Sequence, residues 1–561
     1  MKQLRTIIAV TLLAALSNAC ELIEPPKTGH PQGPVLNLRL YQDNSRHDTA
    51  MAYRFWDFDR EMGPHQQQHV PPGGMLYEGE LATFDSIAAT KIFVQVVPDN
   101  TIDRVLLSIN GGTGTDARHF LSNAGHKILV MVSQRGLHED DMRYECPLGA
   151  GLVNCLKAAS TRHLFRTFNP QDNGRDVVDV LRIIAGEEIL TVDGRLTPAA
   201  EYFAVGDKRV NIVTGSYGAT ILAYALQAFR GLSDRSAAKK NGLGRVFIDG
   251  PSAPYEHVIT DGFRNTKVAL NNKLDSLGLT EHQKSSVLDA MRARHTAPVT
   301  DTSLCPADPS GSVSADCLSS GMIWSYLTNG YETIATTSNE AERLTKMEDL
   351  KRALIAIPAM RATSGSALDA ISAIYTSRHL SSMDRSGKTW ESNRVMLTGG
   401  GSSGLDGAFY GFTSRFAHIC SAYVLRANGD SQTRFDAAKS EDANDPYWYG
   451  FLIAYREMLS ICQQASAGFK NGIIPPRSLG VTAEAVVQFG AGTDEKHHQD
   501  EMDEMAALFA QSTRKLQVFL PEAIQGGSTP VQGHRQCFWE LMNAAFTGGP
   551  GDVHIPVSCL N

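Results

Sequence analysis

A serine flanked by small residues lies between two apolar segments in the first half of the chain. Residues 214–218 read Thr-Gly-Ser-Tyr-Gly, after an apolar run at 210–213 and before a helical pattern. A serine at a strand-to-helix turn is the nucleophile elbow of acyl-transfer enzymes, where small neighbours relieve crowding and the helix N-terminus faces the developing oxyanion. The pattern predicts Ser216 as a nucleophile. A phosphate-binding turn is the alternative, but a second glycine fingerprint and a partner lysine are missing.

A nucleophilic serine needs a general base later in the chain. Hydrolases with this turn carry their groups in the order serine, acid, histidine. His534 follows the last strand-like run and is the predicted base, which takes the Ser216 proton and returns it to the leaving group. An ordinary loop histidine is the alternative, and His497 and His498 are the rival candidates.

The acid is expected at the end of a strand. Asp494 follows the apolar run at 485–489 and is the predicted carboxylate that orients His534. Glu495 is the fallback, and a solvated loop carboxylate is the alternative interpretation.

Two backbone amides are the predicted oxyanion donors. One is the amide of Tyr217, directly after the nucleophile, and the other comes from Gly111 or Gly112 in the segment Asn-Gly-Gly-Thr-Gly at 110–114. That segment follows a strand-like run, and backbone donors tolerate changes of neighbouring side chains. A plain glycine turn is the alternative.

The segments around these residues predict an α/β sheet. Nearly continuous apolar runs at 104–109 and 127–132 suit strands buried on both faces of a parallel sheet. A helical pattern at 176–185 precedes the run at 210–213, so strand and helix alternate. The expected fold class is α/β, specifically an α/β-hydrolase fold with a mostly parallel central sheet.

Long helical patterns dominate the middle of the chain. We expect a large helical cap, or lid, at 252–470, inserted before the C-terminal part of the core. The core then consists of residues 75–251 and 471–561. Residues 20–74 lack sustained periodicity and are interpreted as a tether and N-terminal extension.

The first residues resemble an export signal. A basic start, an apolar run at 7–16 and small residues at 17–19 predict a signal peptide at 1–19. Cys20 follows, as the lipidated cysteine does in bacterial lipoproteins, although the match to a lipobox is imperfect. The predicted location is the bacterial periplasm or the outer membrane, held by this anchor, with free secretion as the alternative.

Cysteine usage agrees with export. Apart from Cys20 the chain has eight cysteines, and none forms a Cys-x-x-Cys pair of metal-site spacing. In an oxidising compartment four disulfides are expected, and nearest-neighbour pairing is our guess. Free buried thiols are the alternative if the chain is not exported. The eight are Cys146, Cys155, Cys305, Cys317, Cys420, Cys462, Cys537 and Cys559.

Composition excludes some partners. The chain of 561 residues is 42% hydrophobic and 20% charged, with a net charge of −8 and no basic stripe. A nucleic-acid partner is therefore not expected. No later apolar stretch reaches the ~20 residues of a membrane span, so a membrane is expected only through the lipid anchor. Neither a metal nor a cofactor is implied.

The ordered landmarks resemble the prolyl and tripeptidyl aminopeptidase-like branch of the α/β-hydrolases. Segment 110–114 is similar to its His-Gly-Gly-Pro-Gly loop, and 133–136 (Ser-Gln-Arg-Gly) to its Asp-Gln-Arg-Gly segment. Ile-Asp-Gly-Pro at 248–251 resembles the Leu-Asp-Gly-Val before the family's cap. Gly533-His534, followed by Cys537 and Cys559, resembles the family's C-terminal end. The resemblance covers about 106–250 and about 486 to the C-terminus.

This resemblance implies a serine peptidase that releases residues from peptide N-termini through a Ser-His-Asp acyl-enzyme mechanism. A carboxylic ester hydrolase with the same triad, and a catalytically silent binding protein on this scaffold, are the alternatives. The expected partner is a peptide or a small acyl substrate. An aminopeptidase needs cap carboxylates for the substrate ammonium group, and Glu340 and Glu342 are weak candidates because helix carboxylates usually face solvent.

Overall fold

The structure is a computed structural model. It describes residues 36–43, 73–81, 90–111, 124–135, 168–254 without 205 and 207, 262–295, 320–359, 418, 420–421, 475–493, 499–547 without 525, and 553–560. Several predictions lie outside the described residues: the signal peptide, Cys20, Gly112, Asp494, Glu495, His497, His498, Cys146, Cys155, Cys305, Cys317 and Cys462.

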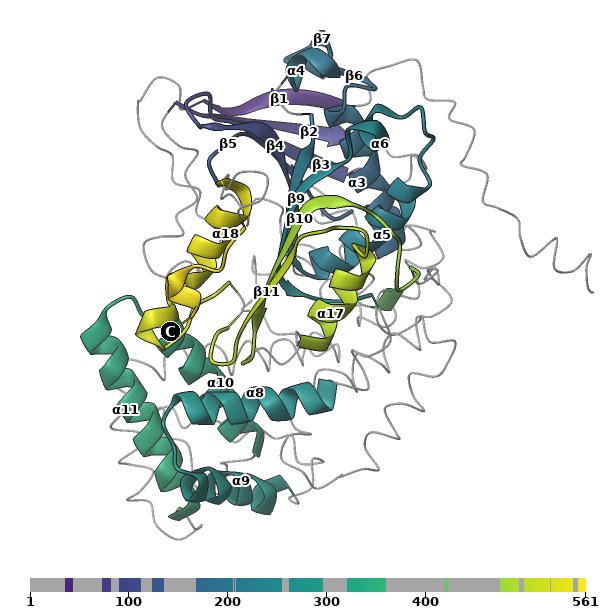
Figure 1. The fold of residues 1–561 in the computed structure, drawn as a ribbon. Helices are drawn as coiled ribbons and strands as arrows, with labels where there is room; N and C mark the ends of the chain where they lie inside the picture. The colour runs from purple at the N-terminus through teal and green to yellow at the C-terminus, as the bar shows by residue number, and fades with distance from the viewer. Residues whose placement is uncertain are drawn as a thin grey trace, which may run out of the picture.

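The described strands form one sheet in the order β11-β10-β9-β8-β4-β5-β3-β2-β1-β6-β7 (Figure 1). From β5 to β11 neighbouring strands run parallel, whereas β3, β2 and β1 alternate in direction. The sheet is therefore mixed, with a parallel central part. Its strands are β1 (Leu36–Asp43), β2 (Met75–Leu81), β3 (Thr90–Val96), β4 (Ile102–Ile109), β5 (His126–Val132), β6 (Ile189–Val192), β7 (Arg195–Pro198), β8 (Val210–Ser216), β9 (Leu243–Pro251), β10 (Ala483–Ala491) and β11 (Lys515–Leu520).

The central strands are buried on both faces, as their continuous apolar sequences predict. Every residue of β9 is buried, and in β8 only the last residue, Ser216, is partly exposed. Helices cover both faces, so the predicted α/β fold with a mostly parallel central sheet is confirmed.

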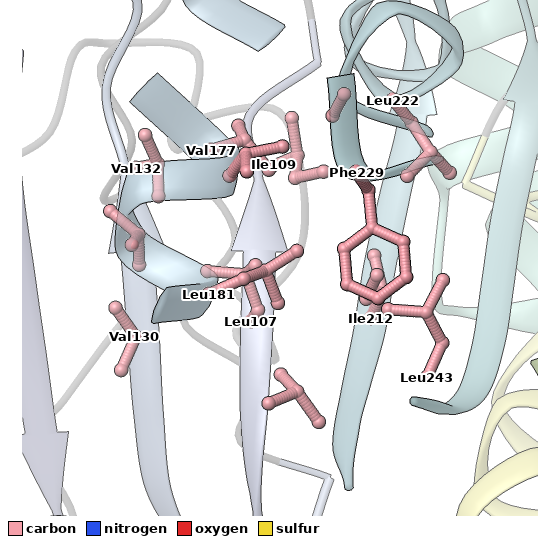
Figure 2. Close-up of a cluster of buried hydrophobic side chains, with 14 of the residues drawn as sticks. Leu107, Ile109, Val130, Val132, Val177, Leu181, Ile212, Leu222, Phe229 and Leu243 are labelled. Atoms are coloured by element: carbon pink, nitrogen blue, oxygen red, sulfur yellow. The ribbon is translucent and has the colours of Figure 1, made fainter. Parts of the chain in front are cut away.

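Different helices cover the two faces of the sheet (Figure 1). One face packs against α3 (Pro170–Ile184), α5 (Tyr217–Arg230) and α17 (Gln499–Leu508), and the other against α18 (Cys537–Thr547). Short helices α4 (Ala199–Tyr202) and α6 (Ala237–Asn241) complete this part of the chain. Figure 2 shows the first core, in which alternate residues of β4, β5 and β8 meet apolar residues of α3 and α5.

Between β9 and β10 the described elements are helices. It contains α8 (Gly262–Ser276), α9 (Glu281–His295), α10 (Ser320–Thr336), α11 (Glu340–Ala356) and the turn η7 (Ile357–Ala359). Asn272 Nδ2 of α8 donates to Gly492 O, just beyond β10, at 2.8 Å. Helix α8 therefore contacts the carboxyl edge of the sheet, while the boundaries at 252 and 470 stay predictions.

The N-terminal region differs from the expected tether in one place. Residues 36–43 form β1, which pairs with β2 antiparallel and with β6 parallel. Leu36 and Leu38 are buried there, because alternate side chains of an edge-region strand face the core. This short alternation places the segment in the sheet.

A disulfide closes the described C-terminal region. Cys537, at the start of α18, is bonded to Cys559 in the turn η12 (Val557–Cys559), 22 residues later. This is the nearest-neighbour pairing expected for these two cysteines. Cys420 is also disulfide-bonded. Within the described ranges, no helix combines the length and apolarity that crossing a bilayer requires.

Candidate active site

Ser216 has the backbone geometry of a nucleophile elbow. It ends β8 and immediately precedes α5, with φ 48° and ψ −131°. A non-glycine residue with positive φ is strained, and such strain persists where the surrounding structure enforces it. This strained backbone at the carboxyl end of β8 is the conformation that a nucleophile elbow requires of its serine.

The two glycines of the elbow are required by close backbone contacts. A Cβ on Gly218 would lie 2.6 Å from the carbonyl oxygen of Ile109, and a Cβ on Gly215 would lie 2.6 Å from that of Asp249. Real Cβ atoms essentially never approach backbone oxygen so closely. The elbow therefore sits tightly between the ends of β4 and β9.

Thr214 occupies the position where the usual elbow has glycine. Its Oγ1 donates a 3.0 Å hydrogen bond to the carbonyl oxygen of Ile109, and the residue is buried. A threonine fits because its hydroxyl is satisfied by the neighbouring strand. This departure from the usual pattern is thus compatible with the turn.

We expect Gly218→Ala to slow acylation of Ser216 about 100-fold, because the added carbon must displace the first turn of α5 or the end of β4. The measurement is the rate at which Ser216 reacts with an acylating probe. Gly231→Ala, at the other end of α5, is the matched control, since Gly231 has φ −72° and the added carbon would meet its nearest atom at 3.3 Å. Equal rates in the two variants would contradict the tight elbow.

The strand register aligns one predicted oxyanion segment with the nucleophile. Ile109 of β4 is the partner of Thr214 in β8. Two residues beyond this pair stand Gly111 and Ser216, so the predicted donor and the nucleophile occupy the same level of adjacent strands. Gln134, just after β5, supports this segment by donating from Nε2 to the carbonyl oxygen of Asn110 at 3.3 Å. The amide of Tyr217 begins α5 beside them.

His534 is paired with a carboxylate, but the partner is Glu522. Nδ1 of His534 forms a short hydrogen bond with Oε1 of Glu522, and the two side chains are 15% and 11% exposed. A carboxylate accepts, so Nδ1 carries the proton and Nε2 remains to take a proton from a serine. His534 lies in the turn η11 (Gln532–His534), and Glu522 is the second residue after β11.

The loop after β11 returns to the elbow side of the sheet. Gly526 N donates to the carboxylate of Asp249 at 3.1 Å. Asp249 is the β9 residue that pairs with Gly215, next to the nucleophile. The loop that carries Glu522 and His534 therefore crosses the end of β10 and reaches the strand beside Ser216.

Helices of the inserted segment hold this loop. The Tyr331 hydroxyl in α10 donates to the carbonyl oxygen of Glu522 at 2.6 Å, and Arg535 Nη2 donates to the carbonyl oxygen of Thr337 at 2.6 Å. Tyr331 is fully buried. The loop that carries Glu522 and His534 is thus anchored to α10 and the residue that follows it, as well as to the sheet.

The two carboxylates considered for ammonium binding have cationic partners in α11. Glu340 forms a short ion pair with Arg343, and Glu342 lies 2.9 Å from Lys346 Nζ. Pairs at these spacings are common between neighbouring turns of a helix. Their negative charge is therefore already balanced within the helix.

A fully buried ion pair joins the end of β5 to α3. Arg135, in the segment after β5, contacts Asp176 of α3 through two hydrogen bonds of 2.6 Å, and both side chains are 0% exposed. Thr90 Oγ1 also donates to Asp176 at 2.6 Å. Arg135 thereby fixes the end of β5 against α3.

Burial lowers the pKa of His418, a fully buried residue of the inserted segment, from 6.5 to about 4. As pH falls through 6.5 the unfolded chain takes up this proton and the folded chain does not, so the free energy of unfolding falls down to about pH 4. The loss should reach about 3 kcal/mol, at ~1.36 kcal/mol per pKa unit. Urea unfolding of wild type and His418→Gln between pH 7 and 4 checks it. Parallel pH curves for the two proteins would contradict this assignment.

Ser216 lies at the end of β8, and His534 contacts Glu522, a carboxylate that the sequence analysis did not single out. Their catalytic roles stay predictions. Asp494 and Glu495 lie outside the described residues, so their role stays a prediction. One signal for Glu522 was available: it is the first carboxylate after the strand-like run at 515–520 and it precedes His534, which also satisfies the order serine, acid, histidine.

Among the described residues no group of three or more histidine, cysteine, aspartate or glutamate side chains could hold a metal ion.

Comparisons with known proteins do not assign the chain to a family. No family model matches the sequence, and no curated protein matches it. Among solved structures, feruloyl esterase B from Aspergillus oryzae is similar with a TM-score of 0.27 and 12% identity, covering 80% of this chain and 72% of the esterase chain. The interpretation of the site therefore depends on its own geometry.

Proposed function

We propose that the protein is a serine hydrolase that cleaves carboxylic acyl compounds through an acyl-enzyme intermediate. Its preferred substrates in this proposal are esters. The observation that carries this proposal is the strained Ser216 at the junction of β8 and α5. The His534–Glu522 pair supports it, since it lies on a loop that returns to the strand beside the elbow.

The proposed reaction gives each of these groups one role. Ser216 Oγ attacks the acyl carbon while Nε2 of His534 takes its proton, and Glu522 stabilises the imidazolium. The amides of Tyr217 and Gly111 hold the oxyanion. Collapse of the tetrahedral intermediate breaks the bond to the leaving group, which receives the proton from His534. A water activated by His534 then releases the acid and restores the serine.

We favour esters over peptides as substrates because the carboxylates considered for binding a substrate ammonium group are already ion-paired. An aminopeptidase needs a carboxylate to bind the substrate's ammonium group. The carboxylates considered for this, Glu340 and Glu342, are balanced by cations of the same helix. A neutral acyl group needs no such partner. A peptidase acting on peptide N-termini is the second candidate, favoured by the Ser-Gln-Arg-Gly and Gly-His landmarks of the sequence.

Export is part of the proposal. The basic and apolar start of the chain, followed by Cys20, supports a signal peptide and a lipid anchor in the periplasm or at the outer membrane. The Cys537–Cys559 disulfide fits an oxidising compartment.

A substrate panel tests the proposal. Mature protein and Ser216→Ala are assayed with p-nitrophenyl esters of short and medium acids, aminoacyl p-nitroanilides and tripeptidyl p-nitroanilides. We expect the highest kcat/KM for an ester, and Ser216→Ala should lower kcat by about 10⁴-fold or more. Preference for a nitroanilide would replace the ester by the peptidase candidate. A folded wild type that turns over none of them would contradict the hydrolase and favour a binding protein.

A further inference from the structure

A histidine of the inserted segment contacts Tyr217, the residue that follows the elbow serine. His418 falls between β9 and β10 in the sequence, and its side chain is fully buried. Its ring stacks on Phe168 with centroids 5.9 Å apart, and it meets the ring of Tyr217 edge-on, also at 5.9 Å. Tyr217 follows the nucleophile in the chain, so the inserted segment supplies a side chain to the support of the elbow.

The groups around His418 determine which of its nitrogens carries the proton. Nε2 lies 3.1 Å from the carbonyl oxygen of Arg135, and a carbonyl only accepts, so Nε2–H donates. The lowered pKa keeps the ring neutral above about pH 4, which leaves a lone pair on Nδ1. The Tyr217 hydroxyl lies 3.3 Å from Nδ1 and therefore donates to it, while Asn173 Nδ2 approaches the same nitrogen at 3.4 Å.

The acceptor for His418 is itself held in place. Arg135 N donates to Asn173 Oδ1 at 3.0 Å, and its guanidinium is fixed by the buried carboxylate of Asp176. Asn173 Nδ2 in turn donates to the carbonyl oxygen of Asn169, the N-cap of α3, at 2.8 Å. A continuous set of hydrogen bonds thus runs from α3 through Arg135 and His418 to the Tyr217 hydroxyl.

We propose that His418 is a positioning residue that, through the Tyr217 hydroxyl, fixes the first turn of α5 and with it the amide that holds the oxyanion. The inference rests on the proposed acyl-transfer function, because that amide matters only where an oxyanion forms. Backbone donors lower the barrier when they are held at the position of the oxyanion and need no reorganisation. Loss of the support therefore slows the chemical step and leaves ground-state binding of the substrate nearly unchanged.

The test compares kcat and KM for the best acyl substrate in Tyr217→Phe, His418→Leu and His418→Gln. Tyr217→Phe removes only the hydroxyl and should lower kcat about 10-fold, and His418→Leu should lower it about 10- to 100-fold, with KM within about 2-fold. His418→Gln should recover part of the rate, because its amide can donate to the Arg135 carbonyl and accept from Tyr217. The double variant Tyr217→Phe/His418→Leu should be no slower than His418→Leu, because both changes cut the same link.

Tyr224→Phe is the matched control, since it removes a buried hydroxyl from the same helix away from the elbow. Its kcat should equal that of wild type, and thermal unfolding of every variant reports on folding. The inference is overturned if Tyr217→Phe and Tyr224→Phe have the same kcat, or if additive losses in the double variant show that the two residues act separately. If folded wild type turns over no acyl substrate, the proposed function is overturned, and this inference with it. If wild type is active and Tyr217→Phe has the same kcat, only the positioning role of His418 is overturned.

Discussion

Glu522→Gln is expected to lower kcat about 10³- to 10⁴-fold. The substitution keeps the shape of the side chain but removes the negative charge that faces Nδ1 of His534. An amide in this place can present its NH₂ group to the ring and so favour the wrong tautomer, and it no longer stabilises the imidazolium. The measurement is steady-state turnover of the best ester, together with thermal unfolding to establish that the variant is folded.

Asp494→Asn is the comparison that makes this result decisive. Asp494 is the acid expected from the sequence, and it follows β10 by three residues in the chain. With Glu522 as the orienting acid, Asp494→Asn should change kcat only a few-fold. The opposite pattern, a large loss for Asp494→Asn and a small one for Glu522→Gln, would return the role to Asp494 and leave the His534–Glu522 contact as a structural one.

Asp176→Asn is expected to cost about 3–5 kcal/mol of unfolding free energy. The change leaves Arg135, which is 0% exposed, as a buried cation without its neutralising carboxylate. Removing one partner of a buried ion pair lowers the free energy of unfolding by more than the whole pair contributes to it, because the remaining charge is buried away from water. Urea unfolding of the variant and wild type measures the effect.

Asp179→Asn provides a matched control on the same helix. Asp179 pairs with Arg182 at 3.3 Å, but both side chains are partly exposed, at 24% and 20%. Its replacement should cost about 1 kcal/mol or less, because water replaces the lost partner. Similar losses in the two variants would show that the Arg135–Asp176 pair is not isolated from solvent.

The elbow could be predicted because its requirements are local. An apolar strand, small residues around Ser216 and a helical pattern all lie within about twenty consecutive residues. The parallel strands could be predicted for a similar reason, since double-sided burial makes them continuously apolar. The hairpin of β6 and β7 was also open to prediction: its turn is Asp193-Gly194, with φ 48° and 78°, the dipeptide that two-residue hairpins favour.

The supporting contacts of the site could not be predicted, because they join distant parts of the chain. Gly526 contacts Asp249 across 277 positions, and that contact holds the loop with Glu522 and His534 against β9. His418 and Tyr217 are 201 positions apart. Nothing in the sequence near His418 distinguishes a residue beside the elbow from an ordinary core histidine.

The central claim is that Ser216 is an activated nucleophile, and covalent labelling tests it most directly. Folded mature protein is treated with a fluorophosphonate, digested, and analysed by peptide mass spectrometry beside Ser216→Ala. The account predicts one phosphonyl adduct, on the peptide that contains Ser216, and no adduct at that peptide in the variant. An adduct on another serine, or a folded wild type that stays unlabelled, would contradict it.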